Sequence, residues 1–253
     1  MTTRQLDAFF RSFLDIEGFG SIDDSLNGLQ VDNDGADLSR LAFAVDANLE
    51  TFRQAAAAGA GLLFVHHGLF WGKPLRVAGS HRRRLQYLLD HNLALYGVHL
   101  PLDQHPGLGN NAGLADLLGI EAPEPFGRYH GRKIGYQGRL REPLTLEQAA
   151  ARIGFAGRPP LGVYPFGKAE SRTCAVVSGG AAGEVREAIE EGLDLYVTGE
   201  MSHSVYAEVM EAGINMIAGG HHSTEVWGVR RVMERCAAEL GLDVVFIDLP
   251  TGL

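Results

Sequence analysis

The chain has 253 residues, of which 45% are apolar and 21% are charged, as in a globular protein of one large or two small domains. Its 31 acidic and 22 basic residues give a net charge of −9, which argues against bulk binding to the phosphate backbone of nucleic acids. Two distant cysteines predict neither a disulfide framework nor a cysteine zinc site. No apolar run approaches the ~18 residues that cross a bilayer, and segment 1–17 lacks the apolar centre of a signal peptide. We therefore expect a cytoplasmic protein with no membrane partner.

Helix-like and strand-like patterns alternate along the chain. Apolar residues from Leu6 to Leu14 recur at helical spacing, and Thr2 with Gln5 has the form of a capping box. Apolar runs typical of buried strands follow at LAFAVD, LLFVHH, LALYGVH, TCAVVSGG, LDLYVTGE, INMIAGGHH and DVVFID. Amphipathic stretches of helical length separate most of these runs, at 48–59, 80–91, 145–155, 181–191, 203–212 and 224–239. This alternation predicts an α/β fold whose helices cover its sheets.

Histidines gather at the predicted carboxyl ends of strands. Five of the ten histidines lie in three such motifs: His66-His67, His99 in HLPLD, and His221-His222 in HHSTE. Open α/β sheets usually build their sites at these strand ends, and imidazole is a ligand for zinc, iron(II), manganese or cobalt. Any one such histidine is more often a turn or core residue, but three motifs together favour metal binding.

Carboxylates accompany two of these motifs. Asp103 completes HLPLD, and Glu225 completes HHSTE. Glu225 would reach the same point as His221 if a helix begins at about Ser223 or Thr224. At least five nitrogen and oxygen ligands exceed what one tetrahedral zinc ion needs. The sequence therefore predicts two ions that share a bridging carboxylate.

The remaining polar candidates are assigned to supporting roles. His99 and His222 either orient the ligands or make simple turn contacts. Glu200 and His203, in TGEMSHS, are candidate catalytic groups for proton transfer; alternatively both are solvated, and Ser202 caps the next helix. The loop SGGAAGE either holds a phosphate on backbone N–H groups or is a plain tight turn. Asn27 and Asn111 are predicted to be structural turn or cap residues.

The domain boundary is placed at a proline-rich segment. Residues 121–145 contain three prolines and are predicted to cross between two lobes. On this basis, residues 1–125 with 220–253 form the metal-site lobe, and residues 126–219 form the second α/β lobe. A second irregular region is expected at 157–172, which is rich in glycine and proline.

Several strings in the chain resemble the GTP cyclohydrolase 1 type 2 homologs, the Nif-three-like dinuclear-metal proteins. They are SLNGLQV, FVHHGLFW, VHLPLDQHPGLGNNAGLADLLG, VSGGAA, YVTGE and AGGHHSTEVWGVR, which run in family order from about residue 25 to 230. The resemblance implies a Nif-three-like fold of two α/β lobes with mixed sheets, in the short form without a central insertion. It also implies a toroidal homohexamer with two divalent metal ions per subunit facing an inner cavity. The implied metal ligands are His66, His67, Asp103, His221 and Glu225, of which Glu225 bridges the two ions.

Two classes of function follow. The first is a metal-dependent hydrolase, cyclohydrolase-like or phosphoesterase-like, in which metal-activated water attacks a nucleotide-like or phosphorylated small-molecule substrate. The second is a non-catalytic metal-binding assembly for metal storage, delivery or sensing, or a regulatory scaffold. The sequence contains no GxSxG nucleophile elbow and no Rossmann fingerprint, which leaves water on metal as the strong nucleophile of a hydrolase. Whether the protein is an enzyme is left open by the sequence.

Overall fold

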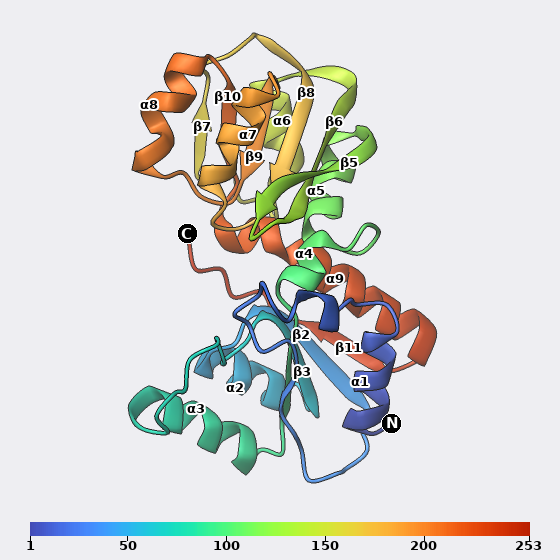
Figure 1. Ribbon diagram of the computed structural model, residues 1–253. Helices are drawn as coiled ribbons and strands as arrows, with labels where there is room; N and C mark the ends of the chain where they lie inside the picture. Colours follow the sequence, from blue (N-terminus) through green and yellow to red (C-terminus); the bar gives the residue numbers. More distant parts are fainter. The chain divides into compact units, whose positions relative to one another are not determined.

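The computed structural model describes residues 1–253, which divide into two compact units (Figure 1). Unit 1 comprises Met1–Leu102 and Val229–Leu249, and unit 2 comprises Asp103–Gly228 and Pro250–Leu253. The chain passes from unit 1 to unit 2 within helix α4 (Leu100–Gln104), back to unit 1 within helix α9 (His221–Leu240), and to unit 2 again after Leu249. The units therefore divide after Leu102 and after Gly228, whereas the sequence pattern predicts boundaries after residues 125 and 219.

Unit 1 is built on a five-stranded sheet of order β1-β4-β3-β2-β11. Its strands are β1 (Gly28–Val31), β2 (Arg40–Asp46), β3 (Leu62–His67), β4 (Ala94–Gly97) and β11 (Asp243–Phe246). Strands β4, β3, β2 and β11 are parallel, whereas the edge strand β1 is antiparallel to β4. Helices α2 (Leu49–Ala57) and α3 (Gly79–Asp90) make the β2–β3 and β3–β4 connections. The carboxyl ends of β2, β3 and β4 therefore lie side by side.

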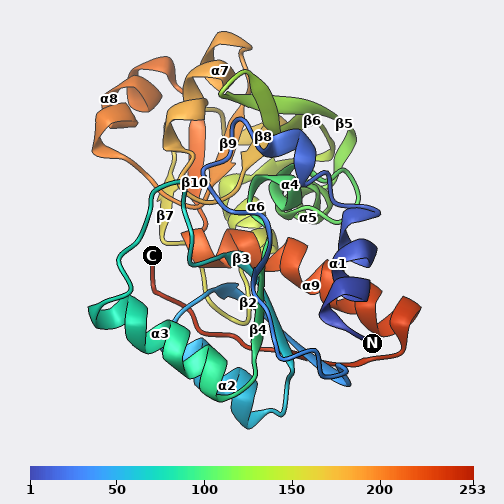
Figure 2. The same ribbon diagram turned by 60° about the horizontal axis from the view of Figure 1, so that its bottom comes forward.

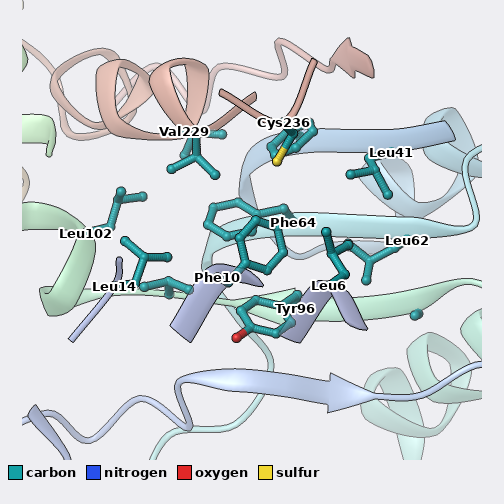
Figure 3. Close-up of a cluster of buried hydrophobic side chains, with 14 of the residues drawn as sticks. Leu6, Phe10, Leu14, Leu41, Leu62, Phe64, Tyr96, Leu102, Val229 and Cys236 are labelled. Atoms are coloured by element: carbon teal, nitrogen blue, oxygen red, sulfur yellow. The ribbon is translucent and has the colours of Figure 1, made fainter. Parts of the chain in front are cut away.

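Helices bury both faces of this sheet. Helix α1 (Thr3–Arg11) begins with the predicted capping box, in which Thr2 and Gln5 cap each other, and a 3₁₀ turn follows at Glu17–Phe19. Phe10 of α1 packs with Phe64 and Tyr96 at ring-centroid separations of 5.0 and 4.8 Å. The carboxyl-terminal part of α9 completes this cluster (Figure 3), the labelled residues of which are Leu6, Phe10, Leu14, Leu41, Leu62, Phe64, Tyr96, Leu102, Val229 and Cys236. Phe52 of α2 and Leu88 of α3 pack with the opposite face.

Unit 2 is built on a mixed six-stranded sheet of order β5-β6-β8-β9-β10-β7. Its strands are β5 (Ile120–Tyr129), β6 (Arg132–Thr145), β7 (Gly162–Tyr164), β8 (Glu170–Val177), β9 (Leu195–Thr198) and β10 (Asn215–Ala218). Strands β8, β9 and β10 are parallel, and the other pairs are antiparallel. The three parallel strands consequently end on one side of the sheet.

The helices of unit 2 are α5 (Asn110–Leu118), α6 (Leu146–Ile153), α7 (Val185–Glu190) and α8 (His203–Ala212), with a 3₁₀ turn at Ala182–Glu184. Leu114 and Leu118 of α5 and Ile153 of α6 pack with sheet residues in one buried cluster. Helices α7 and α8 lie side by side (Figure 2) and are linked by an ion pair between Arg186 and Glu208. No helix in the chain is both long enough and apolar enough to cross a membrane.

Two sequence-based expectations are wrong. Segment 121–145 does not cross between the units; it forms most of the β5–β6 pair. Pro123 and Pro125 fit because β5 is an edge strand whose register with β6 shifts between Glu121 and Glu124. Pro143 lies in β6 where the register with β8 shifts between Arg139 and Leu144, so a missing N–H costs little there too. Helix α9 begins at His221 rather than at Ser223 or Thr224, because Gly220, with φ of +98°, turns the chain directly from β10 into the helix.

Candidate metal-binding site

Three histidines of unit 1 gather at the carboxyl ends of neighbouring strands. His66 and His67 end β3, and His99 follows β4 by two residues. One potential ligand atom from each ring lies within 4.8 Å of those of the other two, and the ring centroids are 4.6–5.6 Å apart. These residues meet because β3 and β4 are parallel and end together. The three imidazoles thus form a cluster that could hold a metal ion.

Hydrogen bonds fix the tautomers of the first two rings. His66 Nδ1 donates to the carbonyl oxygen of Val98 at 2.9 Å, and His67 Nδ1 donates to Asp46 Oδ1 at 2.8 Å. Asp46 ends β2 and lies opposite His67 in the parallel register, which explains the contact. Because a carbonyl or carboxylate oxygen only accepts, each Nδ1 carries the proton and the lone pair of each neutral ring lies on Nε2. This is the arrangement usual for metal-ligating histidines.

The third ring is held by a buried carboxylate. His99 Nδ1 donates to Asp23 Oδ1 at 2.9 Å, and the Asp23 side chain is only 1% exposed. Burial by itself would raise the pKa of Asp23, but hydrogen bonds from His99 and Asn27 hold that pKa below its usual value. Asp23 therefore remains ionised at neutral pH and orients the His99 ring.

Unit 2 presents a second set of potential ligands at the ends of its parallel strands. Ser178 follows β8, Glu200 comes two residues after β9, and His221 begins α9 three residues after β10. Glu225 lies one helical turn further along α9, and its side chain is almost fully buried. Ligand oxygens of Glu225 and Asp103 lie within 4.8 Å of each other, as do ligand atoms of Glu225 and His221. Glu225 is thus the acidic group common to both pairs.

Asp103 is fixed by a buried polar network. Its Oδ1 accepts hydrogen bonds from Asn110 Nδ2 and Ser178 Oγ, both at 2.9 Å. Asn110 Oδ1 also accepts from the backbone N–H of Gly228, and Asn111 Oδ1 accepts from that of Ser178. Both asparagines are fully buried. Asn111 therefore has the structural role expected from the sequence, whereas the tie between Asn110 and Asp103 was not foreseen.

His221 lies between two carboxylates. Its Nδ1 donates to Glu200 Oε1, and its Nε2 lies 3.2 Å from Glu225 Oε1. Burial alone would lower the pKa of His221, but Glu225 and Glu200 raise it to about 10. In the metal-free protein a proton therefore occupies the ring between the two carboxylates. A divalent cation on Nε2 and Glu225 would displace that proton, as ligation of histidine requires.

A glycine makes room for the Glu225 carboxylate. A Cβ built on Gly179 would lie 2.2 Å from Glu225 Oε1 and 3.2 Å from His221 Nε2. Gly179 also has φ of +67°, in the left-handed region. The loop SGGAAGE therefore brings bare backbone against two ligand atoms, while its Gly179 N–H donates to Thr224 Oγ1.

The donor set fits a divalent ion of borderline hardness. It consists of imidazole nitrogens and carboxylate oxygens, which suit zinc, iron(II), manganese or cobalt. The thiols take no part, since Cys174 and Cys236 are buried in the hydrophobic clusters and burial raises the pKa of each, that of Cys236 to about 12. The residues present are therefore chemically suited to the ions that the sequence predicts.

Other sequence candidates take separate places. His203 is the exposed first residue of α8, and Ser202 caps that helix by accepting from Ser204 N–H, as the alternative interpretation expected. His222 is buried and follows the potential ligand His221 in the chain. Asn27 donates to Asp23 and accepts from the His99 N–H, so it is structural.

Two carboxylates at the site were missed from the sequence. Asp46 ends the apolar run LAFAVD, so its position at a strand end was a usable signal. Asp23 lies 76 residues before His99 in an irregular segment, where no pattern points to it.

A small hollow adjoins Glu200 within unit 2. Its volume is about 310 Å³, and it is lined by Leu161, Tyr164, Gly199, Glu200, Met201, Ala218 and Leu253. The lining combines apolar and aromatic side chains with one carboxylate, which is typical of a small-molecule pocket. The hollow therefore offers space beside the carboxylate that holds His221.

The chain is similar along its whole length to proteins of one family. The family model Duf34/NIF3 (NGG1p interacting factor 3) matches residues 1–251. Proteins called GTP cyclohydrolase 1 type 2 homolog from Treponema pallidum and Archaeoglobus fulgidus are 42% and 40% identical, with all of both chains covered in each case. The crystal structure of TTHA1606 from Thermus thermophilus is 40% identical and superposes with a TM-score of 0.90 over all of both chains. The resemblance noted in the sequence and the mixed α/β fold are thereby confirmed.

Proposed function

Because this chain belongs to the Duf34/NIF3 family, we propose that it binds two divalent metal ions and uses them to hydrolyse a nucleotide-like or phosphorylated small molecule. The proposed ligands are His66 and His67 of unit 1 with Asp103, His221 and Glu225 of unit 2, and Glu225 bridges the ions. The observation that carries the proposal is the double pairing of Glu225 with Asp103 and with His221. One carboxylate with a neighbour at each side is the arrangement a bridging ligand needs.

Chain connectivity supports a shared site. Asp103 follows His99 by only four residues, so covalent geometry keeps their Cα atoms within ~14 Å of each other. Unit 1 would supply two imidazoles to the ions, whereas unit 2 would supply one imidazole and both carboxylates. Together the five side chains offer two anionic and three neutral ligands, which partly balance the four positive charges of two divalent ions.

Bound ions would supply Lewis acidity and an ionised water near neutral pH. The residues of the chain then have distinct tasks. Glu200 holds the His221 ring and lies in the wall of the adjoining hollow, where it is suited to accept a proton from a substrate. His203, exposed at the start of α8, is the second candidate for proton transfer. The hollow receives the apolar part of a small substrate.

Metal analysis tests the dinuclear site. After reconstitution with manganese, iron(II) or zinc, the wild-type chain should hold two ions, and Glu225→Ala should lose both. Glu234→Ala, an exposed glutamate on the same helix, should retain two and serves as the control. A wild-type stoichiometry of one ion or fewer per chain would contradict the proposal.

Hydrolysis is tested separately by a screen of nucleotides and phosphoesters with and without metal. Turnover that survives complete chelation would refute the metal-dependent mechanism. Failure of the fully metallated protein to turn over any substrate class would instead favour the non-catalytic metal-binding assembly.

We also propose a toroidal homohexamer in the cytoplasm. Apolar side chains exposed on β7 and α8 of unit 2 support self-association, namely Val163, Tyr206 and Met210. Light scattering should give a mass six times that of the chain, and a monomer mass across a range of concentrations would exclude the assembly.

A further inference from the structure

We propose that His99 is a third imidazole ligand of the metal ions, and that Asp23 is the residue that positions it. This inference rests on the proposed dinuclear site and adds to it a ligand outside the five proposed above. All the residues involved lie in unit 1.

The His99 ring lies where a ligand would be. One of its nitrogens is within 4.8 Å of the ligand nitrogens of both His66 and His67. His66 and His67 end β3, and His99 follows the neighbouring parallel strand β4 by two residues, so the sheet backbone brings them together. Three imidazoles that converge on one point form a common facial set for zinc and related ions.

The tautomer of His99 is also that of a ligand. Its Nδ1 donates to a carboxylate oxygen of Asp23, which can only accept, so the lone pair of the neutral ring lies on Nε2. His66 and His67 are oriented in the same way, by Val98 and Asp46. All three rings thus have an Nδ1 acceptor and present Nε2, as in metal sites where a carboxylate or carbonyl orients each histidine.

Asp23 is unusually well fixed for a residue in an irregular segment. Besides His99 Nδ1, its carboxylate accepts from Ser25 N–H at 2.9 Å, Asn27 Nδ2 at 2.8 Å and Leu100 N–H at 3.0 Å. Asn27 in turn accepts from the His99 N–H at 2.7 Å. Both the ring and the backbone of His99 are therefore tied to one buried anion.

A turn contact alone does not account for this network. A histidine needed only to pack against Trp71, whose ring lies 5.0 Å away edge-on, would not require a buried carboxylate at Nδ1. Burying an anion costs free energy even when hydrogen bonds compensate part of it. Here the anion holds a ring that has one nitrogen within 4.8 Å of ligand nitrogens of two further imidazoles. Positioning of a ligand explains both features.

The test compares zinc binding by the full-length wild-type chain, His99→Gln and Asp23→Asn. His91→Gln is the matched control, because His91 is exposed in the same unit and its Nδ1 contacts only its own helix, at Tyr87 O. Zinc affinity is measured by calorimetry, the imidazole number by X-ray absorption, and folding by circular dichroism.

We expect His99→Gln to weaken the binding of one zinc ion by at least ~10-fold and to lower the average number of imidazoles per zinc. Asp23→Asn should weaken it ~10–100-fold with the imidazoles retained, the usual cost of losing a partner that orients a ligand. If folded His99→Gln keeps both the affinity and the imidazole number of a wild-type chain that binds two ions, this inference fails while the dinuclear site stands. If the wild-type chain binds no zinc, the proposed function itself fails. Should Asp23→Asn not fold, His99→Gln decides alone.

Discussion

The Cα of Gly179 lies so close to the Glu225 carboxylate that a Cβ on it would meet Oε1 at 2.2 Å. An alanine there would force the carboxylate to move, because ordinary van der Waals contact begins only at 3.4 Å. We predict that Gly179→Ala lowers the metal content of the protein, because the displaced Glu225 can no longer pair with both Asp103 and His221. Metal analysis after reconstitution measures this directly.

A second glycine separates this effect from backbone strain. Gly192 has φ of +68°, close to the +67° of Gly179, but nothing lies within 4 Å of its added Cβ. Both alanine variants should lose about 1–2 kcal/mol of stability, the cost of a left-handed alanine. Only Gly179→Ala should lose metal. Equal metal content in the two variants would show that Glu225 does not need the space.

Elements of the fold could be predicted from the sequence where a local pattern, such as a helix cap or an apolar periodicity, determines the structure without tertiary contacts. The capping box of Thr2 and Gln5 is confirmed, and the stretch predicted at 203–212 coincides with α8. The β5–β6 pair was missed because prolines normally break strands, and only tertiary context shows that β5 is an edge. The early start of α9 was missed because a positive φ at Gly220 cannot be read from glycine content.

The candidate site was predictable where strands deliver its residues. His66, His67 and His221 could be proposed because a strand end and a potential metal ligand coincide in one short string. Asp23 and Asn110 were not, because their partners His99 and Asp103 are selected by folding: Asp23 comes from a segment without regular structure, and Asn110 had no feature that set it apart from other turn residues. The proposed ligands could therefore be named from the sequence, whereas the residues that hold them could not.

Asn110 should stabilise the fold through its hydrogen bond to the Asp103 carboxylate. It donates to Asp103 Oδ1 and accepts from Gly228 N–H while fully buried. Asn110→Leu keeps the volume but leaves the Gly228 N–H without its acceptor and removes a donor from Asp103, so we expect a loss of about 1–3 kcal/mol in unfolding free energy. Urea denaturation measures it. The matched change Gln54→Leu, at an exposed amide on α2, should have little effect, and unchanged stability of Asn110→Leu would contradict the buried network.

Asp194 should stabilise unit 2 in a pH-dependent way. Burial by itself raises the pKa of its carboxyl, but hydrogen bonds from Lys168 and from the N–H groups of Arg172 and Thr173 bring that pKa below its usual value. A carboxyl whose pKa is lower in the folded state stabilises the fold above its unfolded pKa of ~3.9 and loses this contribution as pH falls through the folded value.

Asp194→Asn should therefore be less stable than wild type at pH 7, by about 1–2 kcal/mol because the exposed Lys168 partner is screened by solvent. The difference should shrink below about pH 4. Denaturant unfolding at several pH values checks this, with Glu170→Gln, an exposed carboxylate two residues after Lys168, as a control that stays constant. A difference that does not change with pH would mean that the carboxylate charge is not what stabilises the fold.

Glu200 and His203 should differ in their effect on metal binding. Glu200 accepts the Nδ1 proton of the proposed ligand His221, whereas His203 is exposed on α8. Glutamine in place of Glu200 would lose the negative charge that fixes the ring and makes it a stronger ligand. We therefore predict that Glu200→Gln weakens metal binding ~10–100-fold, and that His203→Ala leaves it unchanged.

Calorimetric titration with zinc separates this role from proton transfer. If Glu200 acts only on a proton during hydrolysis, Glu200→Gln should bind zinc like the wild type and lose turnover roughly 10²–10⁴-fold. If Glu200 acts through His221, Glu200→Gln should bind zinc more weakly, and saturating zinc should restore part of its turnover. An unchanged affinity would show that the Glu200–His221 contact does not govern ligation, because the ring would then hold its metal equally well without the charged acceptor behind it.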